Sequence, residues 1–368
     1  MSWFDHWTVW ITLALAFHQS PAPSGLLTTP FVKAWSYLTT DTLRYNGAVA
    51  DSRQVFAPLR DGQLMAFERS AGEQAWAVQY ARQWTTGISM DEQTLYLGSA
   101  SSASDSAQHY SLLAVDKQTG RIRWEKSWPQ QITAVSVQPA TADSVSSRLY
   151  LGDAGGFFTA IDPSSQQVIW QVKTEQAVSA SAREHEGIVY TGSDDGRLYA
   201  LDARTGAERW RFSTHGPVRA RVEISPDRIF VGSFDGSLYC LERGSGRQRW
   251  RTRTGAAIAA QPLLIAHRLI VCSYDNFAYA LDSKSGAIQW KTKLSGRLIA
   301  EPIRHGDSVL VAALRASNVM MLRVSDGQLI GSLELGKGIE LVAAPVMTDT
   351  ILVMTTDRGI IAARLISN

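Results

Sequence analysis

The amino-acid sequence predicts an all-β protein, an eight-bladed β-propeller of four-stranded antiparallel blades. Three observations predict it: tryptophans recur at a nearly constant spacing, each interval contains four short segments of alternating apolar residues, and turn residues bound every segment. The tryptophans follow a step of 40 residues at 170, 210, 250 and 290, and those at 35, 76 and 124 extend the series. A repeat of about 40 residues with four strands is typical of propeller blades.

Residues 178–213 show the four strands of one period, with the sequences VSASARE, GIVYTGS, GRLYALD and AERWRFS. Each alternates β-branched or aromatic residues and is bounded by Gly, Asp or Ser. Nothing keeps the helical period of 3.6, which excludes a solenoid of helix pairs. The first strand of several periods contains proline, at Pro139, Pro262, Pro302 and Pro345. Because proline cannot donate to a strand ladder, we expect these strands to be edge strands that line the central channel.

A motif joins the third and fourth strands: alanine, an acidic residue, a turn that ends in glycine, and tryptophan, as in Ala200, Asp202, Gly206 and Trp210. The carboxylate is expected to accept turn hydrogen bonds, the glycine to supply positive φ, and the alanine to leave room for the indole. We expect the tryptophans to dock between adjacent blades; they are Trp35, Trp76, Trp124, Trp170, Trp210, Trp250 and Trp290. The departures are Gln166 in place of glycine, and Met321, Arg323 and Gly331 in place of alanine, acid and tryptophan.

The number of periods predicts how the ring closes. Complete periods end near residues 80, 128, 173, 213, 253, 293 and 335, and the remaining residues supply three strands. We expect the segment around Trp35 to provide the missing fourth strand, which would remove an open sheet edge. The propeller then spans residues 31–368. Serine-rich insertions at 99–110 and 141–147 are expected to be surface loops.

The N-terminal segment, residues 1–18, contains an apolar run from Trp7 to Phe17 that is too short to span a bilayer but suits a secretory signal. No basic residue precedes the run, so a surface helix or a misassigned start remains the alternative. No cysteine follows it, and we therefore expect no lipid anchor attached through cysteine. Residues 19–30 are expected to form a linker. The signal-like apolar run predicts a periplasmic or other extracytoplasmic location.

The composition limits the function classes. The formal net charge of +2 does not favour a nucleic-acid partner. Cys240 occupies the position of alanine in other periods, so we expect a small packed side chain, with a Cys240–Cys272 bridge as the alternative. The histidines lack metal-ligand spacing, and the sequence SDDG at 193 is expected to be a tight turn rather than a calcium loop. The sequence identifies no catalytic residue, cofactor site or metal site.

The repeated motif resembles that of the PQQ-type (pyrroloquinoline quinone) eight-bladed propellers. This superfamily holds quinoprotein dehydrogenases and the non-enzymatic outer-membrane assembly lipoprotein BamB, and the resemblance covers residues 31–368. A quinoprotein would imply a calcium site, a catalytic Asp, a vicinal disulfide and long capping loops, and the sequence has no adjacent cysteines. The resemblance therefore favours a non-catalytic scaffold that binds proteins. Outer-membrane protein assembly is one role that it implies for such a scaffold. A quinone-dependent oxidoreductase and an extracytoplasmic sensor or ligand-binding module are the alternatives.

Arginines are concentrated in the middle periods. Those of the fourth strands fit alternation on solvent-facing outer strands; they are Arg209, Arg211, Arg249, Arg251 and Arg253. The candidate partner-binding residues are instead expected on innermost strands, near the mouth of the channel; they are Arg219, Arg221, Glu301 and Arg304, with Glu223 and Gln261 beside them. We expect a protein partner, peripheral association with a membrane at most, and a monomer.

Overall fold

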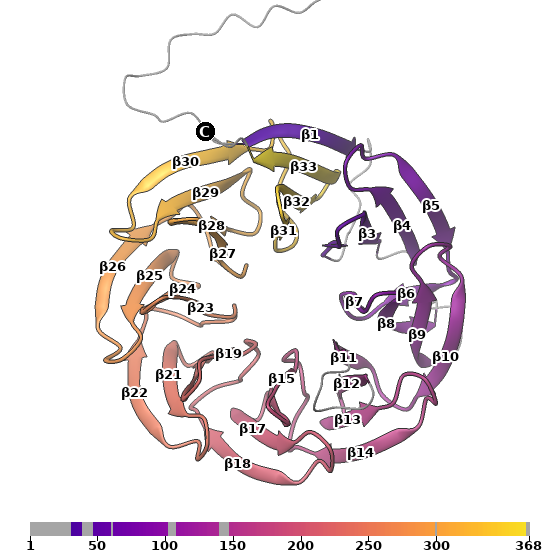
Figure 1. The fold of residues 1–368 in the computed structure, drawn as a ribbon, viewed down its shortest axis with the longest axis horizontal. Coiled ribbons are helices and arrows are strands. Elements are labelled where there is room, and N and C mark those ends of the chain that lie inside the picture. The colour runs from indigo at the N-terminus through magenta and orange to yellow at the C-terminus, as the bar shows by residue number, and fades with distance from the viewer. Residues whose placement is uncertain are drawn as a thin grey trace, which may run out of the picture.

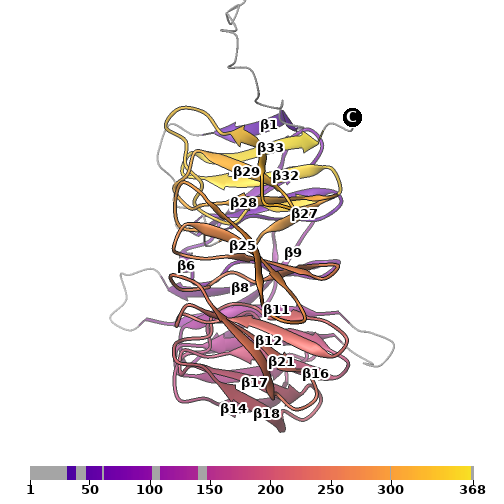
Figure 2. The same cartoon turned by 90° about the vertical axis from the view of Figure 1, so that its left-hand side faces the viewer.

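The computed structural model describes residues 31–38, 47–59, 62–101, 108–139, 147–298 and 300–365. In these residues the strands form eight sheets that surround one axis as blades (Figure 1). Figure 2 shows the ring edge-on, as a disc. The predicted eight-bladed propeller is therefore confirmed. Within the described residues no helix could cross a membrane. The predicted N-terminal segment and linker, half of the first serine-rich insertion and most of the second lie outside the described residues.

Six whole blades are sheets whose four strands follow one another from the axis outwards. The first is β2 (Val49–Ala50), β3 (Gln54–Pro58), β4 (Gln63–Glu68) and β5 (Gln74–Gln79). The third blade along the chain is β11 (Ile132–Gln138), β12 (Arg148–Asp153), β13 (Phe157–Ile161) and β14 (Val168–Lys173). The fourth is β15 (Arg183–His185), β16 (Ile188–Gly192), β17 (Arg197–Asp202) and β18 (Glu208–Ser213). Then come β19 (Glu223–Ile224), β20 (Arg228–Gly232), β21 (Ser237–Glu242) and β22 (Gln248–Arg253), and β23 (Leu263–Ile265), β24 (Arg268–Cys272), β25 (Phe277–Asp282) and β26 (Ile288–Lys293). The last is β27 (Ile303–His305), β28 (Ser308–Ala312), β29 (Asn318–Arg323) and β30 (Leu329–Glu334).

The second blade along the chain is irregular on its inner side. Two short strands, β6 (Arg82–Trp84) and β7 (Ser89–Met90), both pair with β8 (Thr94–Ser101). Outside β8 lie β9 (Tyr110–Asp116) and β10 (Ile122–Trp128). The inner edge of this blade is therefore interrupted where the other whole blades have one strand.

The eighth blade combines the two ends of the described chain. Its order is β1 (Phe31–Leu38), β33 (Gly359–Leu365), β32 (Ile351–Thr356) and β31 (Val346–Thr348). In the β1–β33 register Phe31 pairs with Leu365 and Leu38 pairs with Gly359. The N-terminal strand thus supplies the outermost strand of the last blade (Figure 1), which confirms the predicted split blade.

The innermost strands are shorter than the sequence predicted. Pro262, Pro302 and Pro345 lie immediately before β23, β27 and β31, and Pro139 lies immediately after β11. The prediction that these prolines lie within the strands was wrong. Because proline has no N–H to donate, it marks a limit of the ladder instead.

Antiparallel pairing divides the turns between the two faces of the disc. The turns between first and second strands lie on the same face as the turns between third and fourth strands, and we call this the first face. The turns between second and third strands share the opposite, second face with the segments that lead from one blade to the next. Apolar clusters fill the space between neighbouring blades; Tyr190 and Trp210 of one blade pack with Tyr239 and Leu241 of the next.

The motif places a small side chain directly opposite each large one. Ala200 pairs with Trp210 across β17 and β18, and Cys240 pairs with Trp250 in the next blade. Asp202 Oδ1 accepts hydrogen bonds from the Arg204 and Thr205 backbone N–H groups, at 3.1 and 2.9 Å. This carboxylate shapes the turn that carries the chain from the third strand to the fourth.

Candidate functional site

Arg219 lies on the second face, in the segment between β18 and β19, with its side chain 46% exposed. Its guanidinium makes a two-point ion pair with Asp194 of the β16–β17 turn, with Nε–Oδ1 and Nη2–Oδ2 distances of 2.8 and 2.9 Å. Hydrogen bonding to this carboxylate raises the pKa of Arg219. The same guanidinium lies 5.0 Å from the centre of the Phe234 ring, in a cation–π contact.

Phe234 continues this cluster toward the next blade. It belongs to the β20–β21 turn, and its ring centre lies 5.8 Å from that of Tyr274 in the β24–β25 turn, in an edge-to-face arrangement. Both rings are partly exposed. We call Asp194, Arg219, Phe234 and Tyr274 the turn patch. It brings together the ion pair between Asp194 and Arg219 and two aromatic rings, from three consecutive blades, on one surface.

Three members of the turn patch were not predicted from the sequence. Asp194, Phe234 and Tyr274 occupy the same position in three consecutive repeats, within the turns SDDG, SFDG and SYDN. The position varies while its neighbours stay nearly constant. Since corresponding positions of adjacent blades are neighbours in a ring, this variation was the available signal.

Arg221 and Glu301 lie close to the axis, in the segments just before β19 and β27, and both are exposed to solvent. The protein atoms around the channel nevertheless remove part of the water from around both charged groups. This desolvation, together with the positive charge of Arg183, lowers the pKa of Arg221. Desolvation likewise raises the pKa of Glu301, and the attraction of Arg221 opposes that rise. The two residues therefore belong to one group of interacting charges near the axis.

Arg183 and Glu223 complete this group. Their side chains form an ion pair, with Arg183 Nη1 2.6 Å from Glu223 Oε2. The Gln261 amide donates to the same carboxylate oxygen at 2.9 Å. Three consecutive blades are thus connected near the axis by charged and amide groups.

The structure corrects where the predicted partner-binding residues lie. Arg304 is on β27, but Arg219, Arg221 and Glu301 precede the innermost strands instead of forming part of them. Arg219 and Arg221 have different surroundings although they are two residues apart: Arg219 contacts Asp194 and Phe234, whereas Arg221 interacts with the charges near the axis. Arg304 donates to the carbonyl oxygen of Gly306 in its own turn, at 3.3 Å.

The seams between blades follow a common geometry at six of the seven motif tryptophans. Each of these indole Nε1–H groups donates to a backbone carbonyl oxygen of the next blade. The accepting residue directly follows the acidic position of the motif, which is occupied by Arg323 in the last whole blade. The pairs are Trp35 with Arg69, Trp76 with Lys117, Trp170 with Ala203, Trp210 with Arg243, Trp250 with Ser283 and Trp290 with Val324, at 2.7 to 3.2 Å. The ring also lies against the turn glycine of that blade; a Cβ on Gly206 would come within 2.7 Å of Trp170.

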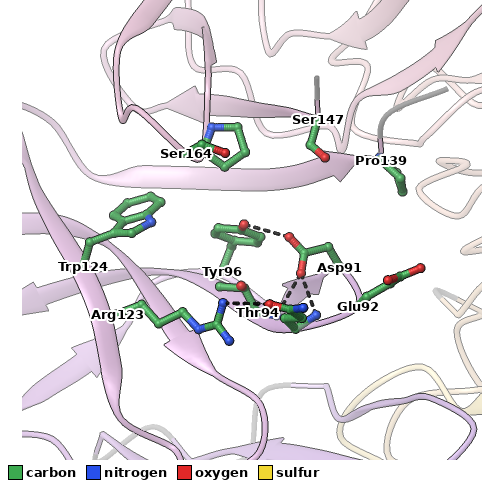
Figure 3. A pocket seen from close by; sticks show the side chains of 11 residues that line it. Asp91, Glu92, Thr94, Tyr96, Arg123, Trp124, Pro139, Ser147 and Ser164 are labelled. Atoms are coloured by element: carbon green, nitrogen blue, oxygen red, sulfur yellow. Dashed lines mark hydrogen bonds between the residues drawn. The ribbon is translucent and has the colours of Figure 1, made fainter. Parts of the chain in front are cut away.

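The seventh seam, at Trp124, is different. Its neighbouring turn carries Gln166, at φ 60°, where the other six have glycine. Among the described residues Trp124 makes no indole hydrogen bond to that turn. A pocket of about 590 Å³ opens on the first face, and Trp124, Pro163 and Ser164 help to line it (Figure 3).

Acidic and hydroxyl groups line the rest of this pocket. The Asp91 carboxylate accepts hydrogen bonds from the Thr94 backbone N–H at 2.8 Å and from the Tyr96 hydroxyl at 2.8 Å (Figure 3). Glu92 is exposed beside it. A second pocket, of about 980 Å³, shares Asp91, Glu92 and Pro139 with the first. The two pockets are therefore neighbours on the same face.

The cysteines and the acidic clusters offer no further site in the described residues. Cys240 and Cys272 are free and buried, and burial raises the pKa of the Cys240 thiol to about 11. In the described part of the chain no three His, Cys, Asp or Glu side chains converge as metal ligands. In the SDDG turn, Asp194 holds Arg219, and Asp195 accepts from the Tyr199 hydroxyl at 2.7 Å.

Comparison with known proteins agrees with the fold. No curated protein sequence matches the chain. The crystal structure of BamB from Moraxella catarrhalis superposes with a TM-score of 0.73 at 19% identity, over 90% of this chain and 97% of that one. The computationally designed Ika8 protein superposes with a TM-score of 0.74 at 15% identity, over 90% and 99% of the two chains. The family model described as outer membrane protein assembly factor BamB matches residues 32–193, 159–231 and 194–367. The chain therefore belongs to the BamB family of outer membrane protein assembly factors.

Proposed function

We propose that the protein is an exported, non-catalytic scaffold whose propeller binds protein partners in outer-membrane protein assembly. The observation that carries this proposal is the BamB family match, which extends over nearly the whole ring. The same family membership supports a periplasmic location. The predicted signal segment is consistent with export, and we propose that the chain acts as a single ring with one principal partner surface.

We place that surface at the turn patch and the adjacent Arg221. Protein interfaces are enriched in arginine and aromatic residues, and their strongest contacts come from such side chains. Arg219 is already oriented by Asp194 and Phe234, so little side-chain freedom is lost when a partner binds. An acidic group of the partner would meet the exposed side of the guanidinium, while its apolar groups would cover Phe234 and Tyr274.

A cross-linking experiment in native envelopes tests the proposal. A photoreactive amino acid replaces Phe234, and the captured protein is identified by mass spectrometry. We expect a component of the outer-membrane assembly machinery. Exchange of Arg219 and Arg221 for Gln, which places no second carboxylate beside Asp194 or Glu301, should then weaken capture in a salt-dependent way while the protein remains folded. The same exchange at Arg249 and Arg251, on the outer strand β22, is the matched control.

Two results would contradict the proposal. If the β22 variant impairs capture as much as the Arg219 and Arg221 variant, the turn patch is not the recognition surface. If the purified protein takes up pyrroloquinoline quinone stoichiometrically in the presence of calcium and oxidises alcohols or sugars, the oxidoreductase alternative replaces the scaffold.

A further inference from the structure

The pocket at Trp124 differs from the two other first-face pockets because a motif indole lines it, and the neighbouring turn carries Gln166 in place of glycine. Trp124 itself has the usual place in its own blade: its ring centre lies 6.1 Å from that of Tyr96, with an interplanar angle of 47°. The corresponding pair, Tyr190 and Trp210, has 5.8 Å and 46°. The difference between the two seams therefore lies in the neighbouring turn, and the indole has not moved.

Gln166 explains why that turn stays away from the indole. At the equivalent position Gly206, an added Cβ would lie 2.7 Å from the Trp170 ring, closer than carbon atoms can approach. Gln166 carries such a Cβ, so its turn cannot close on Trp124 in the same way. The hydrogen bond from the Gln166 N–H to the Asp162 carbonyl oxygen, at 2.8 Å, shows that the turn itself keeps its usual form. The substitution thus changes the contact between the turn and the indole without unfolding the turn.

The charges around the opening favour a cation. Asp91 and Glu92 both line it, and the described donors to the Asp91 carboxylate are all neutral. The Lys117 ammonium donates to the Asp91 backbone carbonyl oxygen at 3.2 Å, but its charge is compensated by an ion pair with Asp51. Arg123 is the cation among the described lining residues, and its Nη2 lies 2.6 Å from Asp116 Oδ2, so its charge is compensated. The pocket therefore has an excess of negative charge.

The shape and the apolar groups narrow the ligand further. A volume of about 590 Å³ is of the size that holds small organic molecules. The indole of Trp124 offers the aromatic face that binds organic cations best, and Pro163 adds an apolar wall. A hydrated metal ion would gain nothing from these two groups, whereas the alkyl groups of an organic cation would pack against both.

We propose that the pocket at Trp124 is a binding site for an alkylammonium group, which rests on the indole face and is held by the negative charge of Asp91 and Glu92. The group belongs to a free small molecule or to a lysine side chain of a bound polypeptide. The site lies on the first face and shares no residue with the turn patch, so it does not depend on the proposed scaffold function.

Calorimetric titration of the full chain with choline tests the proposal. The uncharged isostere 3,3-dimethylbutan-1-ol is the matched probe, because it has the same shape without the charge. We expect saturable binding of choline and at least tenfold weaker binding of the alcohol. Titration with a capped lysine-containing pentapeptide distinguishes the two sources: binding of choline indicates a small molecule, and binding of the peptide alone indicates a polypeptide partner.

Three variants locate the site. Gln166→Gly restores the common seam, and we expect choline affinity to fall at least tenfold while the protein remains folded. Glu92→Gln should weaken choline binding about threefold to tenfold without affecting the alcohol, as expected for loss of one nearby charge. Asp227→Asn, in the corresponding turn of another blade, should change nothing. Equal binding of choline and the alcohol, binding of neither choline nor the peptide, or unchanged choline affinity in Gln166→Gly would overturn the proposal.

Discussion

Gly331 lies directly opposite Met321 across β29 and β30. In the other whole blades this register position pairs a small residue with tryptophan, as Ala200 pairs with Trp210. The sizes of the two partners are therefore exchanged in the last whole blade. The reason lies in the blade that follows: its third and fourth strands, β33 and β1, are distant in sequence, so no tight turn joins them to receive an indole. Met321 instead packs in an apolar cluster with Phe31 and Leu352.

This exchange predicts non-additive effects of substitution. Gly331→Trp should lower the free energy of unfolding by about 1–3 kcal/mol, because a large ring is forced against Met321. Met321→Ala should cost about 2–5 kcal/mol through the cavity it leaves. The double variant should lose less than the sum, since each change makes room for the other. Urea denaturation of the four proteins measures the coupling, and additive losses would show that the two sites are independent.

The closing strand gives a second prediction. Deletion of residues 31–38 removes β1 and leaves the edge of β33 unpaired, so we expect a large fall in melting temperature and concentration-dependent association through the open edge. Deletion of residues 1–25 retains β1 and is the control, with an expected melting temperature close to that of the full chain. Thermal unfolding and light scattering compare the two. Equal melting temperatures would mean that β1 does not close the ring.

The fold could be predicted because one register recurs in every motif. The spacing of alanine, acid, glycine and tryptophan specifies a third strand, a turn and a fourth strand, and counting periods left one strand for Trp35 to supply. Strand limits near the axis were predicted less well. β19 contains only Glu223 and Ile224, so Arg219 and Arg221 lie before the strand begins. The alternation of side chains along a strand therefore does not apply to them.

The surroundings of the candidate sites were not predictable from single repeats. Arg219 meets Asp194 and Phe234 from two blades, and these contacts depend on how turns meet across a seam. The Gln166 departure was visible in the sequence, but its consequence needed the position of the Trp124 ring in the neighbouring blade. The sequence therefore identified the exceptional residue but not the pocket that Trp124 lines beside it.

The glycine of the motif gives a third prediction, which separates backbone strain from contact with the indole. Gly206 and Gly187 both have positive φ, 74° and 72°, but an added Cβ meets Trp170 at Gly206 and nothing within 4 Å at Gly187. Gly187→Ala should cost only the backbone term, about 1–2 kcal/mol. Gly206→Ala should cost more, because the indole must also shift. Chemical denaturation of both variants tests this, and equal losses would show that the seam does not depend on close contact between glycine and tryptophan.

The motif carboxylates give a fourth prediction, on acid stability. Partial burial alone would raise the pKa of Asp202, but hydrogen bonds from Arg209 and Thr205 outweigh it and lower the pKa to about 2. A carboxylate with a lowered pKa stabilises the fold at a pH above the unfolded-state pKa of about 3.8, and this contribution is lost as the pH falls toward 2. Asp202→Asn keeps one turn acceptor but loses the ion pair between Asp202 Oδ2 and Arg209 Nη2, which are 2.6 Å apart. The variant should therefore melt at a lower temperature than the native protein at pH 5, and the difference should disappear as the pH approaches 2.

Arg209→Gln should reproduce this pH dependence, because it removes the other partner of the same ion pair. Melting curves at pH 5, 4, 3 and 2 provide the measurement, and a constant difference over that range would show that the Asp202 charge does not contribute to stability.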